Sequence, residues 1–330
     1  MSTLVAAVLF GAIVLYGVFG GADFGTGLWD LTAGGARRGA RPRALIDHSI
    51  GPVWEANHTW LIFCLVILWT GFPTAFAAIM TTQYIPLGIA AFGIVLRGSG
   101  FAFRKVSMRT AEQRLNGVAF AASSVITPFC FGAVVGGIAS GRVPTEGHGD
   151  PVNSWLNPTS VLGGALAVLT CAYLAAIFLI AEAHRQADPD LERWSRNRAV
   201  AAAIVTGAIA IAGPFVLDHD AHRLYLRLLH VGWPLMLVSA VAGLAALATA
   251  LRGTPRLVRP LGVLAVAALL AGWGTAQYPN LLGTHLSIRE GAAPAATLDA
   301  LVVVTVVFAA LVGPSLVALY VLTTRGRLQS

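Results

Sequence analysis

A carboxylate and an imidazole lie within the apolar segment "GPVWEANHTWLIF", which covers residues 51–63. Glu55 and His58 are three residues apart and Trp54 is four residues before His58, so the three side chains share one face of a helix. A carboxyl group whose pKa is raised by burial and an imidazole can both exchange protons near neutral pH. The segment therefore predicts proton transfer as its chemistry.

Other roles are open for the same two side chains. Glu55 could pair with Arg97 or with an arginine of a connecting loop and anchor the end of its helix, and conduction and anchoring are both compatible with these residues. His58 could bind haem iron, because His is a common axial ligand. No other histidine of the sequence pairs with it convincingly, which favours hydrogen-bonded packing and no haem on this chain.

A second acid, Asp23, lies in "YGVFGGADFGTGLWDL", residues 16–31, among several glycines. Glycine in a membrane helix allows either close packing of two backbones or a break that lines a cavity. An ionised side chain in hydrocarbon costs about 2.5–3.5 kcal/mol, so we expect Asp23 to face protein. Gln83, His230 and Asp299 are the other polar side chains that we expect within apolar spans.

The composition indicates an integral membrane protein. Of 330 residues, 56% are hydrophobic and only 11% are charged, against about 25% charged residues in a soluble domain. The net charge of +7 is explained by basic loops that orient the chain in the membrane, and we expect no nucleic-acid partner. The apolar N-terminus is expected to be a retained first span and not a cleaved signal peptide. Cys64, Cys130 and Cys171 fit no metal or redox spacing and are expected to fill the core.

Apolar runs between charged or Pro/Gly-rich breaks predict nine transmembrane helices. They cover residues 4–31, 50–72, 74–96, 115–140, 157–183, 199–217, 228–251, 260–278 and 298–323. We expect one all-α transmembrane domain, residues 1–330, built as two four-helix bundles plus one peripheral helix.

The arginines predict how these helices are oriented. Every second connection and the C-terminal tail hold most of the basic residues: Arg37, Arg38, Arg41, Arg43, Arg97, Arg104, Lys105, Arg109, Arg114, Arg185, Arg193, Arg196, Arg198, Arg252, Arg256, Arg259, Arg325 and Arg327. The connections on the other side hold only Arg142, Arg223, Arg227 and Arg289. Because cytoplasmic loops are enriched in Lys and Arg, the N-terminus is expected outside and the C-terminus in the cytoplasm.

This orientation places the two acids at similar depths. Asp23 is about eight residues, or roughly 12 Å, from the cytoplasmic end of the first span. Glu55 is about five residues, or roughly 8 Å, from the same end of the second span. Together they predict an access path for protons or cations from the cytoplasm.

The sequence lacks the motifs of several enzyme classes. It contains no Walker loop, no glycine-rich dinucleotide motif after a strand, no HExxH and no CxxC. A secondary transporter and a subunit of an energy-transducing complex are the two functions left open by the residues themselves.

Four motifs occur in order through the first third of the chain: "GGADFGTGLWDL", "SIGPVWEANHTWLI", "GFPTAFA" and "YIPLGIAAFGIVLRGSGFAFR". In these motifs the chain resembles subunit II of the cytochrome bd-type quinol oxidases, including the cyanide-insensitive branch. The resemblance implies a haem-free subunit in the prokaryotic inner membrane, whose partner, subunit I, carries two b-type haems and one d-type haem. The complex would oxidise quinol and reduce dioxygen to water with cytoplasmic protons. A small third subunit, and a quinone or lipid as structural ligand, are compatible with it.

The resemblance also assigns roles to residues. Glu55, directly after Trp54, holds the acidic position that the family associates with proton access to the haems, although Asp is common there. Asp23, Asn57 and Arg97 match their counterparts, and so form the expected proton pathway and its support together with Glu55 and Trp54.

Two further positions complete the expected site. Trp60 matches a Trp near the apolar route proposed for dioxygen. The place of His58 is filled by Gln in longer members, so its role in proton transfer is inferred from the residue type alone. A self-sufficient proton- or ion-coupled secondary transporter is the alternative function.

Overall fold

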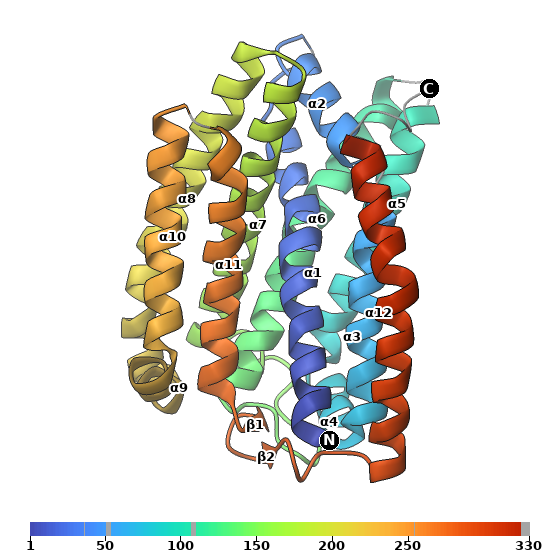
Figure 1. The fold of residues 1–330 in the computed structure, drawn as a ribbon, viewed down its shortest axis with the longest axis vertical. Coiled ribbons are helices and arrows are strands. Elements are labelled where there is room, and N and C mark those ends of the chain that lie inside the picture. The colour runs from blue at the N-terminus through green and yellow to red at the C-terminus, as the bar shows by residue number, and fades with distance from the viewer. Residues whose placement is uncertain (36, 51–53, 107–109, 254, 325–330) are drawn as a thin grey trace.

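The structure is a computed structural model that describes residues 1–35, 37–50, 54–106, 110–253 and 255–324. Some side chains beside the gaps, among them those of Trp54 and Glu55, lie outside this description. The described chain is almost entirely helical (Figure 1). Its helices are α1 (Ser2–Leu31), α2 (Ala40–Ile50), α3 (Trp54–Gly71), α4 (Pro73–Thr82), α5 (Tyr84–Val106), α6 (Thr110–Ala139), α7 (Pro158–Arg185), α8 (Pro189–Asp220), α9 (His222–Arg227), the π-helix η1 (Leu228–Gly232), α10 (Trp233–Leu251), α11 (Pro255–Gln277) and α12 (Ala295–Thr324).

Eight helical segments of the described chain are long and apolar enough to cross a membrane, and the bent pair α3–α4 supplies a ninth. The expected all-α class with about nine spans is therefore confirmed. Two expectations were wrong. The expected third span, 74–96, is divided: α4 turns by 116° from α3, and the helix that crosses is α5. Residues 40–50, expected mostly as a loop, form α2.

The break before α4 has a local cause. Phe72 has non-helical backbone angles (φ −139°, ψ 61°), and Pro73 occupies the first turn of α4. Proline is favoured at the first position of a helix, where its missing N–H costs nothing, and disfavoured within one. The expected boundary between the spans 50–72 and 74–96 falls at this break, but hydropathy does not predict the angle between the two helices.

The helices form one continuous bundle with one outlying helix. The helix α1 packs on α3, α6 and α7, and α6 packs on α5 and α7; α7 packs on α8 and α11, and α10 packs on α8 and α11. Because α6 and α7 also pack on each other, the expected division into two four-helix bundles stays a prediction. The outlying helix α12 packs mainly against α3 and α1, at one edge of the bundle (Figure 1).

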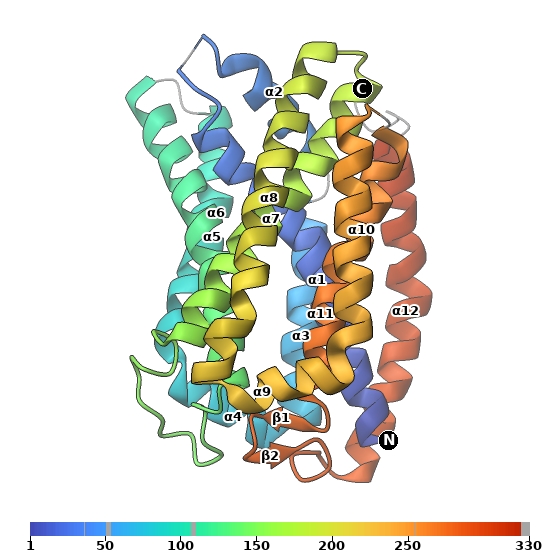
Figure 2. The same ribbon diagram turned by 90° about the vertical axis from the view of Figure 1, so that its left-hand side faces the viewer.

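The two ends of the bundle differ. The connections that carry most of the arginines meet at the upper end in Figure 1, together with α2. We call this the arginine-rich end. The opposite end holds α4, the crosswise helix α9 (Figure 2), and the antiparallel strands β1 (Asn280–Leu282) and β2 (Leu286–Ser287). The helix α1 begins at this opposite end, whereas α12 ends at the arginine-rich end.

Cys64, Cys130 and Cys171 are buried and free. They pack among apolar side chains of the helices, which confirms the expectation that they fill the core.

Candidate functional site

Glycines on α1 bring it close to two neighbouring helices. A Cβ atom added at Gly25 would lie 1.8 Å from the carbonyl oxygen of Cys171 on α7, and one added at Gly27 would lie 2.2 Å from Cβ of Ser124 on α6. Both distances are far below van der Waals contact, so only glycine permits this approach. Because α1 is one continuous helix through Asp23, the glycine-rich motif serves close packing and not a helix break.

This packing encloses a buried ion pair. A carboxylate oxygen of Asp23 accepts a 2.7 Å hydrogen bond from Nη2 of Arg97, which also donates to the backbone carbonyl of Asp23 at 2.9 Å. The other terminal nitrogen, Nη1, donates to the hydroxyl of Ser124. The side chains of Asp23 and Arg97 are only 1% and 2% exposed, so the pair connects α1, α5 and α6 inside the bundle.

Aromatic rings cover the cation of this pair. The guanidinium carbon of Arg97 lies 4.4 Å from the ring centre of Phe120 and 5.1 Å from that of Phe24. The faces of these rings attract the positive charge. Removing either partner would leave a buried charge uncompensated, a change that typically costs 3–5 kcal/mol.

His58 of α3 faces this region. Its ring centre lies 5.9 Å from that of Phe24 and 6.2 Å from that of Tyr16, both on α1. Asn57, the preceding residue, is buried at 3% exposure. The structure thus brings Asp23, Arg97 and His58 into one region.

Trp54 and Glu55 belong to α3, whose described part runs from Trp54 to Gly71. Their side chains are outside the described part of the structure, so their contacts are not assigned. The expected depth of Glu55 in its helix stays a prediction. Within the described residues, the carboxylate that pairs with Arg97 is that of Asp23.

Trp60 lies apart from the charges. Its ring is in edge contact with Phe308 of α12, 6.0 Å between centres, and Phe63 stacks on Phe308 at 4.5 Å. The three rings form an apolar contact between α3 and α12.

Other polar residues expected within spans lie elsewhere. Gln83 lies at the break between α4 and α5, fully buried, and donates to the carbonyl of Ser154 at 3.0 Å. His230 in η1 and Asp299 in α12 are exposed. None of these three belongs to the region around Asp23.

Two buried carboxylates near the arginine-rich end were missed by sequence reasoning. Asp30, 4% exposed, accepts a 2.8 Å hydrogen bond from Nε of Arg43. Glu182, 7% exposed, lies 3.4 Å from His48 and pairs with Arg185. Both acids lie within a turn of an expected helix end, where charge is ordinary. The i, i+3 spacing of Glu182 and Arg185 was the one available signal.

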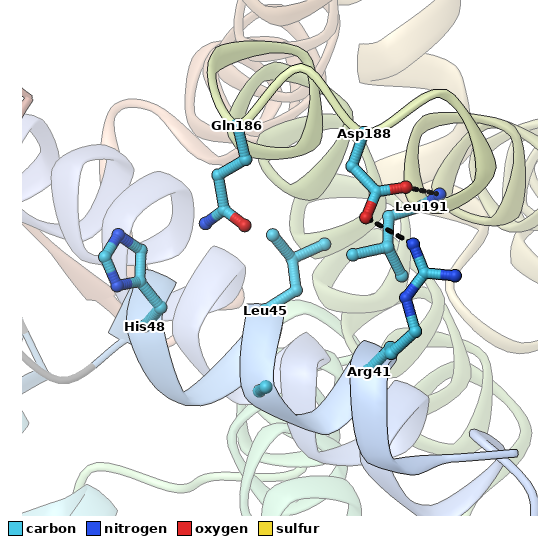
Figure 3. A pocket seen from close by; sticks show the side chains of 7 residues that line it. Arg41, Leu45, His48, Gln186, Asp188 and Leu191 are labelled. Carbon is cyan, nitrogen blue, oxygen red and sulfur yellow. Dashed lines mark hydrogen bonds and ion pairs between the residues drawn. The ribbon is translucent and has the colours of Figure 1, made fainter.

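These contacts hold α2 against the bundle. Arg41 of α2 donates to Asp188 at 2.6 Å, and a pocket of about 340 Å³ lies between α2 and the turn from α7 to α8. Figure 3 shows Arg41, Leu45 and His48 on one side of this pocket and Gln186, Asp188 and Leu191 on the other. The pKa of Asp188 is lowered, first by the N–H of Leu191 and next by Arg41.

Comparison with known proteins identifies the family. The family model for cytochrome bd terminal oxidase subunit II matches residues 1–323. Subunit 2 of the cytochrome bd ubiquinol oxidase of Bacillus subtilis is 29% identical over 53% of this chain and 51% of its own length. Subunit 2 of the Escherichia coli K12 cytochrome bd-I ubiquinol oxidase is 25% identical over 65% and 55%. The matched region thus spans about half the length of these relatives.

A solved structure supports the fold across the whole chain. A chain of the bd oxidase from Geobacillus thermodenitrificans superimposes with a TM-score of 0.80 at 22% identity, covering 97% of both chains. Because the family model spans nearly the entire sequence, this multi-pass protein of the bacterial inner membrane belongs to the cytochrome bd terminal oxidase subunit II family.

Proposed function

We propose that this chain is the haem-free subunit of a quinol oxidase, and that it stabilises a haem-bearing partner, subunit I. The complex would oxidise quinol and reduce dioxygen to water. The observation that carries the proposal is the family match over residues 1–323. The same proposal treats residues 1–330 as one transmembrane domain and includes a small third subunit and a bound quinone or lipid as further partners.

We place the arginine-rich end in the cytoplasm, because cytoplasmic loops are enriched in Lys and Arg. Reduction of dioxygen to water consumes one proton for each electron, so the complex needs a route for protons. The proposed route begins at Glu55 and continues past Asn57 and His58. Asp23 lines it with negative charge, and Arg97 supports Asp23.

The position of Glu55 near the arginine-rich end of α3 (Figure 1) supports a proton-collecting role, because a carboxylate near the cytoplasmic end can exchange protons with water. The competing role, an anchor for the helix end, predicts loss of assembly when Glu55 is changed and normal activity in the complexes that remain.

The haems belong to the partner in this proposal, and dioxygen would approach along apolar side chains such as Trp60. Among the described residues there is no group of three or more His, Cys, Asp and Glu that could hold a metal ion. His58 is enclosed by Tyr16 and Phe24. These contacts favour packing and proton exchange over iron ligation for this imidazole.

The alternative of a self-sufficient transporter is not favoured, because the family match points to an oxidase subunit. The test is a reduced-minus-oxidised visible spectrum of material purified through a tag on this chain. The chain is co-expressed with subunit I encoded in the same genome, or expressed alone. We expect b- and d-type haem bands only with the partner. A stable chain that never recruits a cytochrome from that co-expression would contradict the proposal.

A further inference from the structure

Several polar atoms near the buried ion pair lack hydrogen-bond partners. They are the second carboxylate oxygen of Asp23, the Nε of Arg97, the hydroxyl of Tyr16 and the hydroxyl of Thr127, all enclosed by protein. A buried polar group without a partner typically costs 1–3 kcal/mol. Such groups in native proteins are usually satisfied by ordered water.

Helix geometry places these atoms along the contact between α1, α5 and α6, which we call the seam. On α6, Ser124 binds Arg97, and Thr127 is one turn further along the same face. Thr127 meets α5 at Gly93, where an added Cβ would lie 2.2 Å from its hydroxyl oxygen. Next along α6, Phe131 contacts the ring of Tyr16 at 6.1 Å between centres.

Tyr16 extends along α1 toward Asp23. Its ring lies over Gly20, since an added Cβ there would be 2.7 Å from the ring. From Gly20 to Asp23 the helix rises only about 4.5 Å. Yet the phenol and the carboxylate make no hydrogen bond, because the Tyr16 hydroxyl and one oxygen of Asp23 are both without a partner. The seam therefore holds donors and acceptors that protein atoms leave without a partner.

Water satisfies this set better than a cation does. Asp23 is already paired with Arg97, so the described side chains of the seam carry no surplus negative charge that would hold a metal ion. The unpaired atoms include a donor, an acceptor and two hydroxyls that can act as either. A water molecule can donate to the carboxylate and accept from a neighbouring hydroxyl at the same time.

We propose that ordered water fills the seam of α1, α5 and α6 between Asp23, Thr127 and Tyr16, and that it passes protons between the Asp23–Arg97 pair and the neighbourhood of His58. Each water would accept a proton from one neighbour and release one to the next. The proton-carrying part rests on the proposed oxidase function, whereas the presence of water does not.

Hydroxyl-radical labelling by X-ray radiolysis tests the water, because side chains beside bound water are labelled preferentially. The probe is the purified complex, with Tyr16 as the reporter. Thr127→Val should lower the labelling of Tyr16 severalfold, whereas Thr127→Ser, which keeps the hydroxyl, should leave it near the wild-type level. Equal labelling of Tyr16 in wild type and Thr127→Val, or no labelling in either, would overturn the water-filled seam.

Turnover per haem tests the proton transfer. Tyr16→Phe should slow dioxygen reduction about a hundredfold and raise the solvent isotope effect, because a phenol that exchanges protons is lost. Tyr173→Phe is the matched control: the Tyr173 hydroxyl is also buried without a partner, but it lies on α7 beside Gly262. Unchanged turnover in Tyr16→Phe would overturn the proton-transfer role. Haem content, measured first, separates this outcome from failure of the oxidase proposal.

Discussion

The helices around α1 and the helices at the outer edge of the bundle differ in how many of their side chains are buried. In the most apolar 18-residue windows of α6 and α7, 50% and 56% of residues are buried, against 11% in α8 and 6% in α12. The charges of Asp23 and Arg97 are buried in the first set. In α10–α12, no charged side chain that the structure describes is buried. Charge is tolerated inside this bundle where several helices have already excluded lipid.

The inner and outer helices also differ in the residues that they require. The inner helices α1, α5 and α6 require particular residues, such as Gly25, Arg97 and Ser124, because backbones touch and charges pair. The outer helices require mainly apolar side chains of sufficient length. Substitutions of the same kind should therefore have unequal effects in the two sets.

The largest effect is expected at the α1–α7 contact. Gly25→Ala puts a Cβ atom 1.8 Å from the Cys171 carbonyl, so the helices must separate, at a cost of at least about 3 kcal/mol. Gly11→Ala on the same helix, with no atom within 4 Å, and Gly313→Ala on α12, also open, are matched controls. Thermal unfolding in detergent measures all three. Equal melting temperatures would remove the distinction between inner and outer helices.

A loss of similar size is expected at the buried ion pair. Arg97→Met should destabilise the protein by about 3–5 kcal/mol, because Asp23 is left charged and unpaired in the interior. The double variant Asp23→Leu/Arg97→Met should recover most of this loss, since an apolar pair carries no desolvation cost. Melting temperatures of Asp23→Leu, Arg97→Met and the double variant form a double-mutant cycle. Strictly additive losses would show that the two residues do not act as a pair.

A smaller effect is expected at the opposite end. Gln83→Leu removes the donor to the Ser154 carbonyl and should cost about 1–2 kcal/mol, as for one buried hydrogen bond. Gln186→Leu changes an exposed side chain and serves as the control. If both variants melt at the wild-type temperature, the Gln83 contact does not contribute to stability.

The smallest effect is expected at the exposed contact of Arg41 with Asp188. Arg41→Ala should barely change the melting temperature at neutral pH, because the Arg41 side chain is 62% exposed and exposed ion pairs contribute little. The pKa of Asp188 is lowered in the folded protein. Its contribution is therefore present above the unfolded pKa of about 3.9 and is lost as the pH falls through the lower folded value.

A pH series of melting temperatures checks this sign. Asp188→Asn should lower stability at neutral pH, and the difference from wild type should shrink as the acid range below about pH 4 is reached. Arg41→Ala should retain most of that pH dependence, because the N–H of Leu191 is the larger cause of the shift. A difference that grows toward acid pH would contradict the assigned direction.

Much of the fold follows from hydropathy and from the arginines. The number of spans and the clustering of basic connections at one end were predicted from apolar runs and loop charges. The break at Pro73 was predicted as a boundary between two spans. The end of α4 at Thr82 was not predicted, because residues 74–96 contain no charged side chain. The helix α2 was not predicted because its segment contains several charged residues, as a connecting loop does.

The candidate site was predicted less completely. The cost of an ionised side chain in hydrocarbon indicated that Asp23 faces protein, and the structure places it in the region of Arg97 and His58. Sequence spacing gave no pairing between Asp23 and Arg97, which are 74 residues apart. Asp30 and Glu182 were missed because an acid near a helix end is ordinary, and only tertiary packing buries it.

The most direct test of the proposed proton route is turnover per haem in Glu55→Gln. Gln can hydrogen-bond but cannot carry a proton, so we expect a complex with normal haem content and oxygen consumption slowed about a hundredfold, as when a general acid–base group is lost. Glu55→Asp, which keeps the acid, should be close to wild type. Normal turnover per haem in Glu55→Gln, with or without a lower yield of complex, would contradict the route and leave Glu55 as a structural anchor.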